Sequence, residues 1–326
     1  MKQKNIQICV SHRIDLESAL VPNPLYQPVL CGSVFLKGKT PPGFMRDDVG
    51  DNISERRMTF CEVTIQYWMW KNLQLDYYGL CHYRRYLAFH APKKTVQNEY
   101  GHFIGNYPTR QAQKRYGLLD ERAMRMKIAS CDILAARPAE VQKLHTPYGI
   151  KETVREHWAA HDDFIKPELL DLVLQLVDER APQYSQSARE YYESQKVWGF
   201  NCYVMCKKAF DELCSFEFPI LFELEKRLDT TGYTQNQRRS PGFASEILYG
   251  IFLYHHSKTG DYKIETVPLV YFEETEANAS ALKIGWFALK HRAIRWINFK
   301  LLPYGSSRRK WLKQCLLSLH IVQSKK

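Results

Sequence analysis

Apolar residues recur along the chain with two different periods, and each period predicts one type of element. Short apolar runs are typical of buried strands and occupy residues 6–10, 77–80, 131–135, 199–206 and 262–269. Longer segments with an apolar residue at every third or fourth position predict helices at residues 53–72, 115–129, 151–161, 167–180, 186–195, 207–228 and 243–256. Strands that alternate with helices predict an α/β fold, in which a mostly parallel or mixed sheet has helices on both faces.

The helix predicted at residues 53–72 carries a clear apolar stripe. Its members recur at the spacing of one buried helical face and are Phe60, Val63, Tyr67 and Trp70. Asn52, with Glu55 three residues later, fits a capping pair at the start of this helix. Within the helix predicted at residues 207–228, Pro219 predicts a bend or a restart.

The charge of the chain is concentrated at its C-terminal end. The chain has 326 residues, and its 46 lysines and arginines exceed its 35 aspartates and glutamates by 11. Eleven basic residues and no acidic residue lie between Lys283 and Lys326, so residues 1–282 are neutral overall. A neutral body argues against a nucleic-acid-binding face across the main domain. The surplus instead predicts a local cationic docking surface.

Composition favours a globular protein of a reducing compartment. Hydrophobic residues make up 45% of the chain and charged residues 25%, proportions typical of folded globular domains. The nine cysteines are scattered, odd in number and without a Cys-x-x-Cys pair, which predicts buried thiols in the cytoplasm. Neither a signal peptide nor a spanning run of about 20 apolar residues is expected.

Three polar clusters are candidates for chemistry. The first precedes the helix at residues 53–72 and comprises Asp47, Asp48, Asp51 and Asn52. These residue types build turns and complement the helix dipole. The alternative is that their side chains reach a sugar or ribose hydroxyl, or a metal ion.

The second cluster follows the strand predicted at residues 77–80 and comprises His82, Tyr83, Arg84 and Arg85. Ligands of open α/β sheets bind at the carboxyl ends of strands, where arginines hold phosphate and aromatic rings offer stacking planes. The alternative is that both arginines pair with nearby carboxylates.

The third cluster combines Arg238 and Arg239 with Glu246 near the start of a predicted helix. A carboxylate at such a corner can act as general base for an acceptor hydroxyl, and the arginines can hold a diphosphate leaving group. The alternative is that Glu246 only complements the dipole of the first helical turn.

Residues 47–87 resemble the hallmark of a bacterial glycosyltransferase family from capsule, exopolysaccharide and O-antigen gene clusters, long catalogued as an uncharacterised domain. The hallmark reads Asp-Asp-x-Gly-Asp-Asn-Ile-Ser, then Tyr-Cys-Glu-Leu-Thr, Tyr-Trp-x-Trp-Lys-Asn and Gly-Leu-Cys-His-Tyr-Arg-Arg-Tyr. The chain departs from it mildly, at Val49, Phe60 and Val63. Similarity resumes at residues 199–210 and 239–248.

The resemblance implies a nucleotide-sugar transferase with a GT-A-like, Rossmann-related fold. In that fold a metal-binding Asp-x-Asp normally follows the fourth strand, and residues 82–85 take that place here. Cationic side chains are therefore expected to replace the metal as the clamp for the diphosphate. Metal dependence stays open, because Asp48 or Asp132 can still hold a manganese or magnesium ion.

The resemblance also implies roles for individual residues. Glu246 is the expected catalytic base. The expected donor-binding residues are Asp47, Asp48, Asp51, Asn52, Glu62, His82, Tyr83, Arg84, Arg85, Asn201, Arg238 and Arg239. The expected donor is a UDP-sugar, with galactose-type donors common in such clusters, and the expected acceptor is a lipid-linked glycan. Glu62 alternatively pairs with an arginine of residues 82–85, and the whole body is alternatively a non-catalytic scaffold.

The basic tail, residues 283–326, is expected to form two amphipathic helices at residues 283–302 and 308–322. Basic faces with tryptophan-rich apolar sides fit in-plane binding to an anionic membrane surface. The expected membrane contacts are Trp286, Arg295, Trp296, Arg308, Arg309 and Trp311. These features predict a catalytic domain at residues 1–282, a membrane-associating tail, and a peripheral position on the inner face of the cytoplasmic membrane. The alternatives are that one tail helix packs on the body, or that the tail binds nucleic acid.

Overall fold

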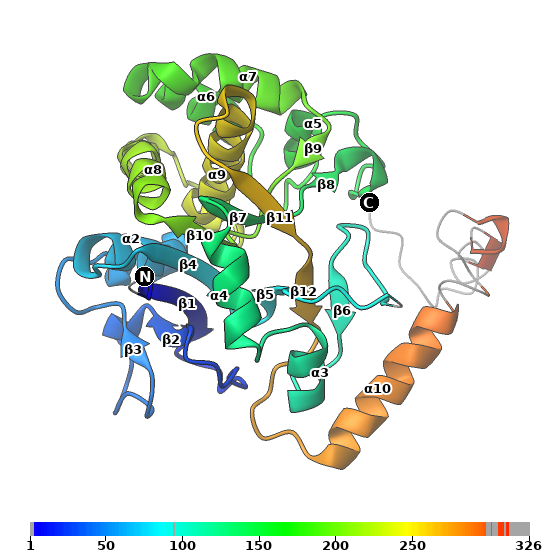
Figure 1. Cartoon of the computed structure of the whole chain (residues 1–326). Coiled ribbons are helices and arrows are strands. Elements are labelled where there is room, and N and C mark those ends of the chain that lie inside the picture. Colours follow the sequence, from blue (N-terminus) through cyan, green and yellow to red (C-terminus); the bar gives the residue numbers. More distant parts are fainter. Residues whose placement is uncertain (1–2, 94, 298–300, 302–305, 310, 313–326) are drawn as a thin grey trace. The chain divides into compact units, whose positions relative to one another are not determined.

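A computed structural model of the chain describes all residues except 1–2, 94, 298–300, 302–305, 310 and 313–326 (Figure 1). The chain divides into a body, residues 1–277, and a C-terminal unit, residues 278–326. This division falls five residues before the boundary expected from the charge pattern.

A mixed sheet forms the centre of the body (Figure 1). Its strands follow the order β11-β7-β10-β4-β1-β2-β3. Their bounds are β1 (Ile6–Arg13), β2 (Tyr26–Cys31), β3 (Met45–Arg46), β4 (Tyr77–His82), β7 (Ile133–Ala136), β10 (Tyr203–Cys206) and β11 (Ile264–Val267). Only β10 runs against its neighbours β4 and β7 in this row, whereas the pairs among β1, β2, β3 and β4 and the pair of β7 with β11 are parallel. The structure thus confirms the predicted parallel-rich α/β fold.

Short strands extend this sheet beside the end of β4. Strand β5 (Arg85–Leu87) turns back from β4 and pairs with β12 (Leu269–Phe272), which also pairs with β6 (Phe103–Gly105). A separate pair, β8 (Ala139–Glu140) and β9 (Lys196–Val197), lies outside the main sheet. The hairpin from β4 to β5 places the histidine and arginines of residues 82–85 in a tight turn.

Alternating residues of the central strands face two different cores. Cys9, Leu80 and Ile133 belong to one buried cluster, whereas their neighbours Val10 and Cys81 belong to the other. Such alternation, with apolar residues on both faces, is expected of a sheet covered on both sides.

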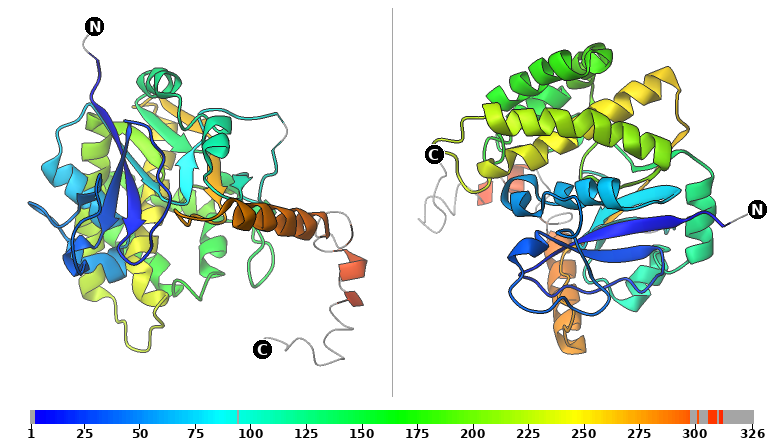
Figure 2. Two further views of the ribbon diagram at one scale, coloured as in Figure 1. Left: turned by 90° about the horizontal axis from the view of Figure 1, so that it is seen from below. Right: turned by 90° about the vertical axis from the view of Figure 1, so that its left-hand side faces the viewer.

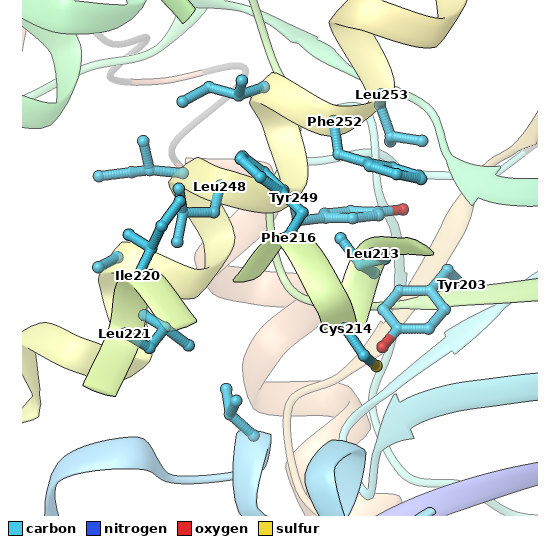
Figure 3. Close-up of a cluster of buried hydrophobic side chains, with 14 of the residues drawn as sticks. Tyr203, Leu213, Cys214, Phe216, Ile220, Leu221, Leu248, Tyr249, Phe252 and Leu253 are labelled. Carbon is cyan, nitrogen blue, oxygen red and sulfur yellow. The ribbon is translucent and has the colours of Figure 1, made fainter. Parts of the chain in front are cut away.

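Helices supply the opposing surface of each core (Figure 2). The larger core contains residues of α2 (Val63–Asn72), α6 (Glu168–Arg180), α7 (Ser185–Glu193), α8 (Lys207–Arg227) and α9 (Ser240–Thr259). The smaller core contains residues of α4 (Glu121–Ala129). Side chains of α8 and α9 interleave beside Tyr203 of β10, whose ring lies 5.3 Å from that of Tyr249 (Figure 3). Burial of these large apolar side chains is the main source of stability of the body.

Several helical bounds differ from the predicted ones. In the body, the described residues also form α1 (Arg57–Phe60), α3 (Arg110–Arg115) and α5 (Val154–Ala159). Short 3-10 turns lie at Ser33–Phe35, Ser54–Arg56, Val141–Lys143, Pro182–Tyr184 and Gln237–Arg239. The helix predicted at residues 53–72 is interrupted at Cys61, which has a φ of 53°. Helix α8 continues through Pro219 without a restart. The spacing of apolar residues predicts which face of a helix is buried. It does not predict a local break in the backbone such as the one at Cys61.

The C-terminal unit contains one helix with described bounds, α10 (Ala281–Trp296). Ser280 caps it, and its apolar side chains Leu282, Trp286, Leu289 and Trp296 are more than half exposed. Most of the second predicted tail helix, residues 308–322, lies outside the described residues. Across the described part of the chain, no helix combines the length and the apolar character needed to cross a bilayer.

Candidate functional site

A pocket of about 310 Å³ lies at one edge of the central sheet. His82, the last residue of β4, and Arg137, directly after β7, both line it. Strand β10 runs in the opposite direction, so the segment that precedes Tyr203 reaches the same edge. The pocket is lined by Glu62, His82, Arg85, Tyr100, His102, Arg137, Ala139, His157, Trp158, His161, Phe164, Val197, Trp198, Gly199, Phe200, Arg239, Phe243 and Glu246. Its position is where open α/β sheets bind their ligands.

Five of the residues predicted from the sequence meet in this pocket. They come from the break between α1 and α2, the hairpin from β4 to β5, the 3-10 turn before α9, and α9 itself. They are Glu62, His82, Arg85, Arg239 and Glu246. The pocket therefore joins two carboxyl groups to two guanidinium groups from segments that are far apart in the sequence.

Glu246 is held in place by the loop that precedes β10. Its Oε2 accepts a hydrogen bond of 2.8 Å from the backbone N–H of Phe200. A Cβ added at Gly199 would lie 3.0 Å from the same oxygen, so a glycine at this position leaves room for the carboxylate. Helix α9 begins at Ser240, and Glu246 lies in its second turn, so the expectation of a first-turn dipole complement is wrong.

The surroundings of Glu246 suit a general base. Burial of the carboxyl group and the nearby charge of Glu62 raise its pKa to about 7. The hydrogen bond from Phe200 and the charges of Arg85 and Arg239 act in the opposite direction. A base with a pKa near the working pH is effective, because it is ionised in part and still binds a proton well.

The loop that contacts Glu246 has an unusual backbone. Phe200 and Asn201 have φ values of 71° and 39°, a region that residues other than glycine rarely adopt. Asn201 is buried and donates a 2.8 Å hydrogen bond to Ser245 Oγ, on the residue before Glu246. Asn201 does not line the pocket, so the structure places it behind the candidate base and not at the predicted donor surface. Strain of this kind is concentrated at functional sites.

The pocket arginines lie against aromatic rings. The Arg85 guanidinium lies 4.7 Å from the ring centroid of Phe200, and that of Arg239 lies 5.4 Å from that of Phe243. Arg239 also donates to the Cys61 sulfur, at 3.0 Å, and the backbone break at Cys61 brings that sulfur near the pocket. Neither guanidinium forms an ion pair with a carboxylate of the described residues, so both charges are available to an anionic ligand.

His82 contributes a neutral ring to the same wall. Burial, together with the charge of Arg85, holds its pKa well below its usual value.

Three residues predicted to bind the donor lie outside the pocket. The guanidinium of Arg84 lies 5.5 Å from the ring centroid of Tyr83. Tyr83 is buried beside His12, and Arg238 is exposed outside the pocket. No ion pair of Arg84 or Arg85 is present in the described structure, so the alternative of carboxylate pairing is not observed there.

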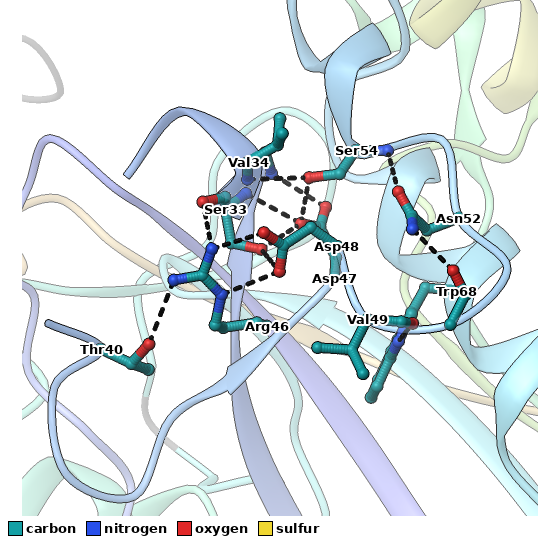
Figure 4. A network of polar contacts seen from close by, with 12 residues as sticks. Ser33, Val34, Thr40, Arg46, Asp47, Asp48, Val49, Asn52, Ser54 and Trp68 are labelled. Atoms are coloured by element: carbon teal, nitrogen blue, oxygen red, sulfur yellow. Dashed lines mark hydrogen bonds and ion pairs between the residues drawn. The ribbon is translucent and has the colours of Figure 1, made fainter. Parts of the chain in front are cut away.

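The side chain of Asp47 is buried and forms its hydrogen bonds with neighbouring residues of the same chain (Figure 4). It is fully buried, and its carboxylate accepts hydrogen bonds from two backbone N–H groups and three hydroxyl groups. The donors are Gly32 N, Ser33 N, Ser33 Oγ, Ser54 Oγ and Thr64 Oγ1. The carboxylate thereby ties the turn after β2 to the start of α2.

The other members of the acidic turn also have local partners. Asp48 pairs with Arg46, and Asp51 accepts a 3.2 Å hydrogen bond from the Tyr67 hydroxyl. Asn52 accepts a 3.2 Å hydrogen bond from the Ser54 N–H and so builds the turn before the 3-10 helix, without pairing with Glu55 as predicted. The four residues of the acidic turn that were predicted to bind the donor do not line the pocket. They are Asp47, Asp48, Asp51 and Asn52.

The predicted metal ligands do not meet at the pocket. Asp132 precedes β7, so it lies at the opposite edge of the sheet from the pocket, where it accepts a hydrogen bond from Lys263 N. Of the described residues, His255, His256 and Asp261 form a group with the spacing of metal ligands. This group is about 14 Å along α9 from Glu246, at a rise of about 1.5 Å per residue. The pocket itself offers two carboxylates among three arginines, which fits an anion better than a divalent cation.

Sequence reasoning missed most of the aromatic and histidine wall of the pocket. Arg137 lies two residues after the strand predicted at residues 131–135, so the rule that ligands bind at strand ends could have identified it. His157, Trp158 and His161 lie at i, i+1 and i+4 in a predicted helix, a spacing shared with ordinary core residues. Tyr100 and His102 carried no signal, because they lie outside every strand and helix predicted from the sequence.

Taken together, the sheet, the helices on both faces and the pocket at the carboxyl edge define an α/β protein of the GT-A type. Residues 7–257 match a family described as a domain of unknown function, DUF4422. The match covers most of the chain, and the chain belongs to this family. It agrees with the resemblance inferred from residues 47–87, although the correspondence of individual motif residues stays a prediction.

One solved structure is similar over most of the chain. The apo structure of WbbM, a bifunctional glycosyltransferase, matches with a TM-score of 0.75 and 23% sequence identity. The match covers 85% of this chain and 47% of the WbbM chain, so the chain spans about half the length of that protein. This similarity establishes the GT-A-like fold. None of the curated proteins matches the sequence.

Proposed function

We propose that the protein transfers a sugar from a nucleotide diphosphate donor, such as a UDP-sugar, to a hydroxyl group of a growing glycan. The observation that carries this proposal is that Glu246, with its pKa near 7, shares one pocket with the guanidinium groups of Arg85 and Arg239, which form no ion pair with any carboxylate of the described residues. The fold similarity to WbbM, a bifunctional glycosyltransferase, supports the same class of reaction. The resemblance of residues 47–87 favours a role in capsule, exopolysaccharide or O-antigen biosynthesis.

In the proposed reaction Glu246 accepts the proton of the acceptor hydroxyl as that oxygen bonds to the anomeric carbon of the donor. The bond between the anomeric carbon and the diphosphate oxygen breaks, and the nucleoside diphosphate leaves with the electron pair. Attack opposite the leaving group inverts the anomeric centre. Arg85 and Arg239 stabilise the negative charge that develops on the diphosphate.

The same arginines take the place that a divalent cation has in many transferases of this fold. Two positive charges beside the leaving group supply the electrostatic stabilisation that a metal would otherwise give. Neither Asp48 nor Asp132 lines the pocket, which supports a clamp made from side chains.

A panel of nucleotide sugars tests the proposal. The purified protein should gain thermal stability with one nucleotide family and release the corresponding nucleoside diphosphate, by slow hydrolysis or by transfer. Binding without any turnover, across the panel and with glycan acceptors present, would instead favour the non-catalytic scaffold. Absence of binding to all nucleotides would refute both ideas.

We further propose that the C-terminal unit binds an anionic membrane surface. Leu282, Trp286, Leu289 and Trp296 recur along one face of α10 and are all more than half exposed. The unit carries eleven basic residues from Lys283 onward and no acidic residue in that range. Exposed apolar side chains beside basic ones favour in-plane binding, which would hold the enzyme near a lipid-linked acceptor on the cytoplasmic face.

Three of the expected membrane contacts are tryptophans with exposed side chains, namely Trp286, Trp296 and Trp311. Arg308 is also exposed and Arg309 is half-buried, whereas the side chain of Arg295 lies outside the described residues.

A further inference from the structure

One wall of the pocket is built from rings that carry nitrogen atoms. His157 and Trp158 lie in α5, His161 follows that helix, and Trp198 follows β9. All four line the pocket, and the ring centroids of His157 and His161 are 4.8 Å apart. This ring wall comes from residues 154–198, a part of the chain that supplies none of the pocket carboxylates or arginines.

Each of these rings has a nitrogen without a hydrogen-bond partner in the described part of the chain. The atoms are His157 Nδ1, Trp158 Nε1, His161 Nε2 and Trp198 Nε1. The side chains are not exposed ones, since His157 is 3% and Trp158 is 9% accessible to solvent. Buried polar atoms are usually paired in folded proteins, so four unpaired nitrogen atoms in side chains that line one pocket favour a polar ligand that pairs with them.

The electrostatics of the ring wall suit an uncharged polar ligand. Burial and the neighbouring ring of His161 lower the pKa of His157 to about 4. Burial also lowers the pKa of His161, against the opposing charges of Glu99 and Asp162. Both imidazoles are therefore neutral at pH 7, and each offers one donor and one acceptor, the pattern that a hydroxyl group complements. Phosphate is better served by the guanidinium groups of Arg85 and Arg239, which line the same pocket.

The same wall offers flat apolar surfaces. The indole rings of Trp158 and Trp198 line the pocket together with the ring of Phe164, which lies 6.2 Å from that of His161 and 5.4 Å from that of Phe243 between centroids. A sugar ring has an apolar C–H face and a rim of hydroxyl groups. Aromatic surfaces with a few converging polar atoms are suited to both.

The ring wall is continuous with the candidate base. Trp198 is followed by Gly199 and Phe200, and the N–H of Phe200 donates to Glu246. Phe243 stands one helical turn before Glu246 on α9. A ligand bound against the ring wall is thereby brought beside the carboxylate that must take a proton from the acceptor.

From these contacts we propose that His157, Trp158, His161 and Trp198 form a subsite for an uncharged sugar ring of the acceptor glycan. The inference rests on the proposed glycosyl transfer and adds the substrate class and the residues that recognise it. It assigns two sets of pocket residues to two substrates, the arginines to the diphosphate and the neutral rings to the acceptor sugar.

The test uses the full chain, UDP (with GDP and dTDP as alternatives) and a panel of methyl hexosides. The indole N–H resonance of Trp158, identified by its loss in Trp158→Phe, is followed by NMR as a hexoside is added to the nucleotide-bound protein. It should shift, whereas the indole resonance of Trp68 should not, because Trp68 Nε1 already donates to Val49 O. His161→Ala should weaken hexoside binding about fivefold, the effect of one lost hydrogen bond between uncharged groups, and leave nucleotide affinity unchanged.

The outcomes separate this inference from the proposed function. Nucleotide binding without any hexoside-induced shift at Trp158 overturns the subsite and leaves the transferase proposal standing. Displacement of the hexoside by the nucleotide, or an equal loss of nucleotide affinity in His161→Ala, assigns the ring wall to the donor and also overturns the inference. Failure of every nucleotide to bind refutes the proposed function itself.

Discussion

The backbone N–H of Phe200 donates a 2.8 Å hydrogen bond to Oε2 of Glu246, while Phe200 itself has a φ of 71°. A left-handed conformation at a non-glycine residue costs on the order of 1–3 kcal/mol, so surrounding contacts must hold it. The contact joins the loop before β10 to α9 and sets the direction of the carboxylate before any substrate arrives. Such preorganisation is a main source of enzymatic rate enhancement.

The first prediction concerns the base. Glu246→Gln keeps the shape of the side chain and removes its ability to accept a proton, so the transfer rate should fall at least about a hundredfold. Nucleotide affinity and thermal unfolding should change little. Glu193→Gln, an exposed change on α7, is the matched control and should behave like the wild type. A Glu246→Gln enzyme with near wild-type rate would remove the assignment.

The second prediction concerns pH. Glu246 acts in its ionised form and its pKa is raised to about 7, so kcat/KM should rise with pH and level off above about pH 7. Glu62→Gln removes a neighbouring negative charge that raises this pKa, so the acidic limb should move to lower pH. Profiles of kcat/KM against pH for both proteins provide the measurement. An acidic limb at the same pH in both would show that the two carboxyl groups do not interact.

The third prediction concerns the diphosphate clamp. Arg85→Gln and Arg239→Gln each remove a charge-assisted contact, so nucleoside diphosphate affinity should fall about tenfold or more. Arg122→Gln, an exposed change on α4, serves as the control. Binding is measured by calorimetry, and transfer is measured in excess chelator, where activity should persist. Activity that is lost in chelator and restored by manganese or magnesium would contradict a clamp of side chains.

The fourth prediction separates structure from binding in the acidic turn. Asp47→Asn replaces a buried carboxylate that accepts five hydrogen bonds, so unfolding free energy should fall by about 3 kcal/mol. Asp51→Asn, at an exposed position in the same turn, should cost far less. Urea denaturation measures both effects. Folded Asp47→Asn protein should bind nucleotide normally, and a selective loss of binding at unchanged stability would restore Asp47 as a donor ligand.

The fifth prediction concerns the C-terminal unit. Changing Leu282, Trp286 and Leu289 to serine in the full chain removes exposed apolar side chains and keeps every charge. The variant should no longer float with vesicles that contain anionic lipid, whereas transfer to a water-soluble acceptor should be unchanged. Wild-type protein should bind neutral vesicles more weakly than anionic ones. Retention of the variant on anionic vesicles would show that the apolar face of α10 is not the contact.

Local pattern was sufficient for much of the fold. Apolar runs such as residues 77–80 and 131–135 become strands β4 and β7, because a strand buried on both faces needs a continuous apolar run. The break at Cys61 was not predictable in this way. It depends on contacts made after folding, including the hydrogen bond from Arg239 to the Cys61 sulfur.

The sequence by itself determined the α/β class, the family and the candidate residues His82 and Arg85 at strand ends and Glu246 in a helix. These follow from local periodicity and short motifs, in which neighbours along the chain carry the information. Only the tertiary structure decided which polar residues share the pocket. It turned Asp47 inward to its own loop and brought His157 and Trp198 into the same pocket as Glu246. The reason is physical: a site formed by segments more than a hundred residues apart exists only after the sheet has set their register.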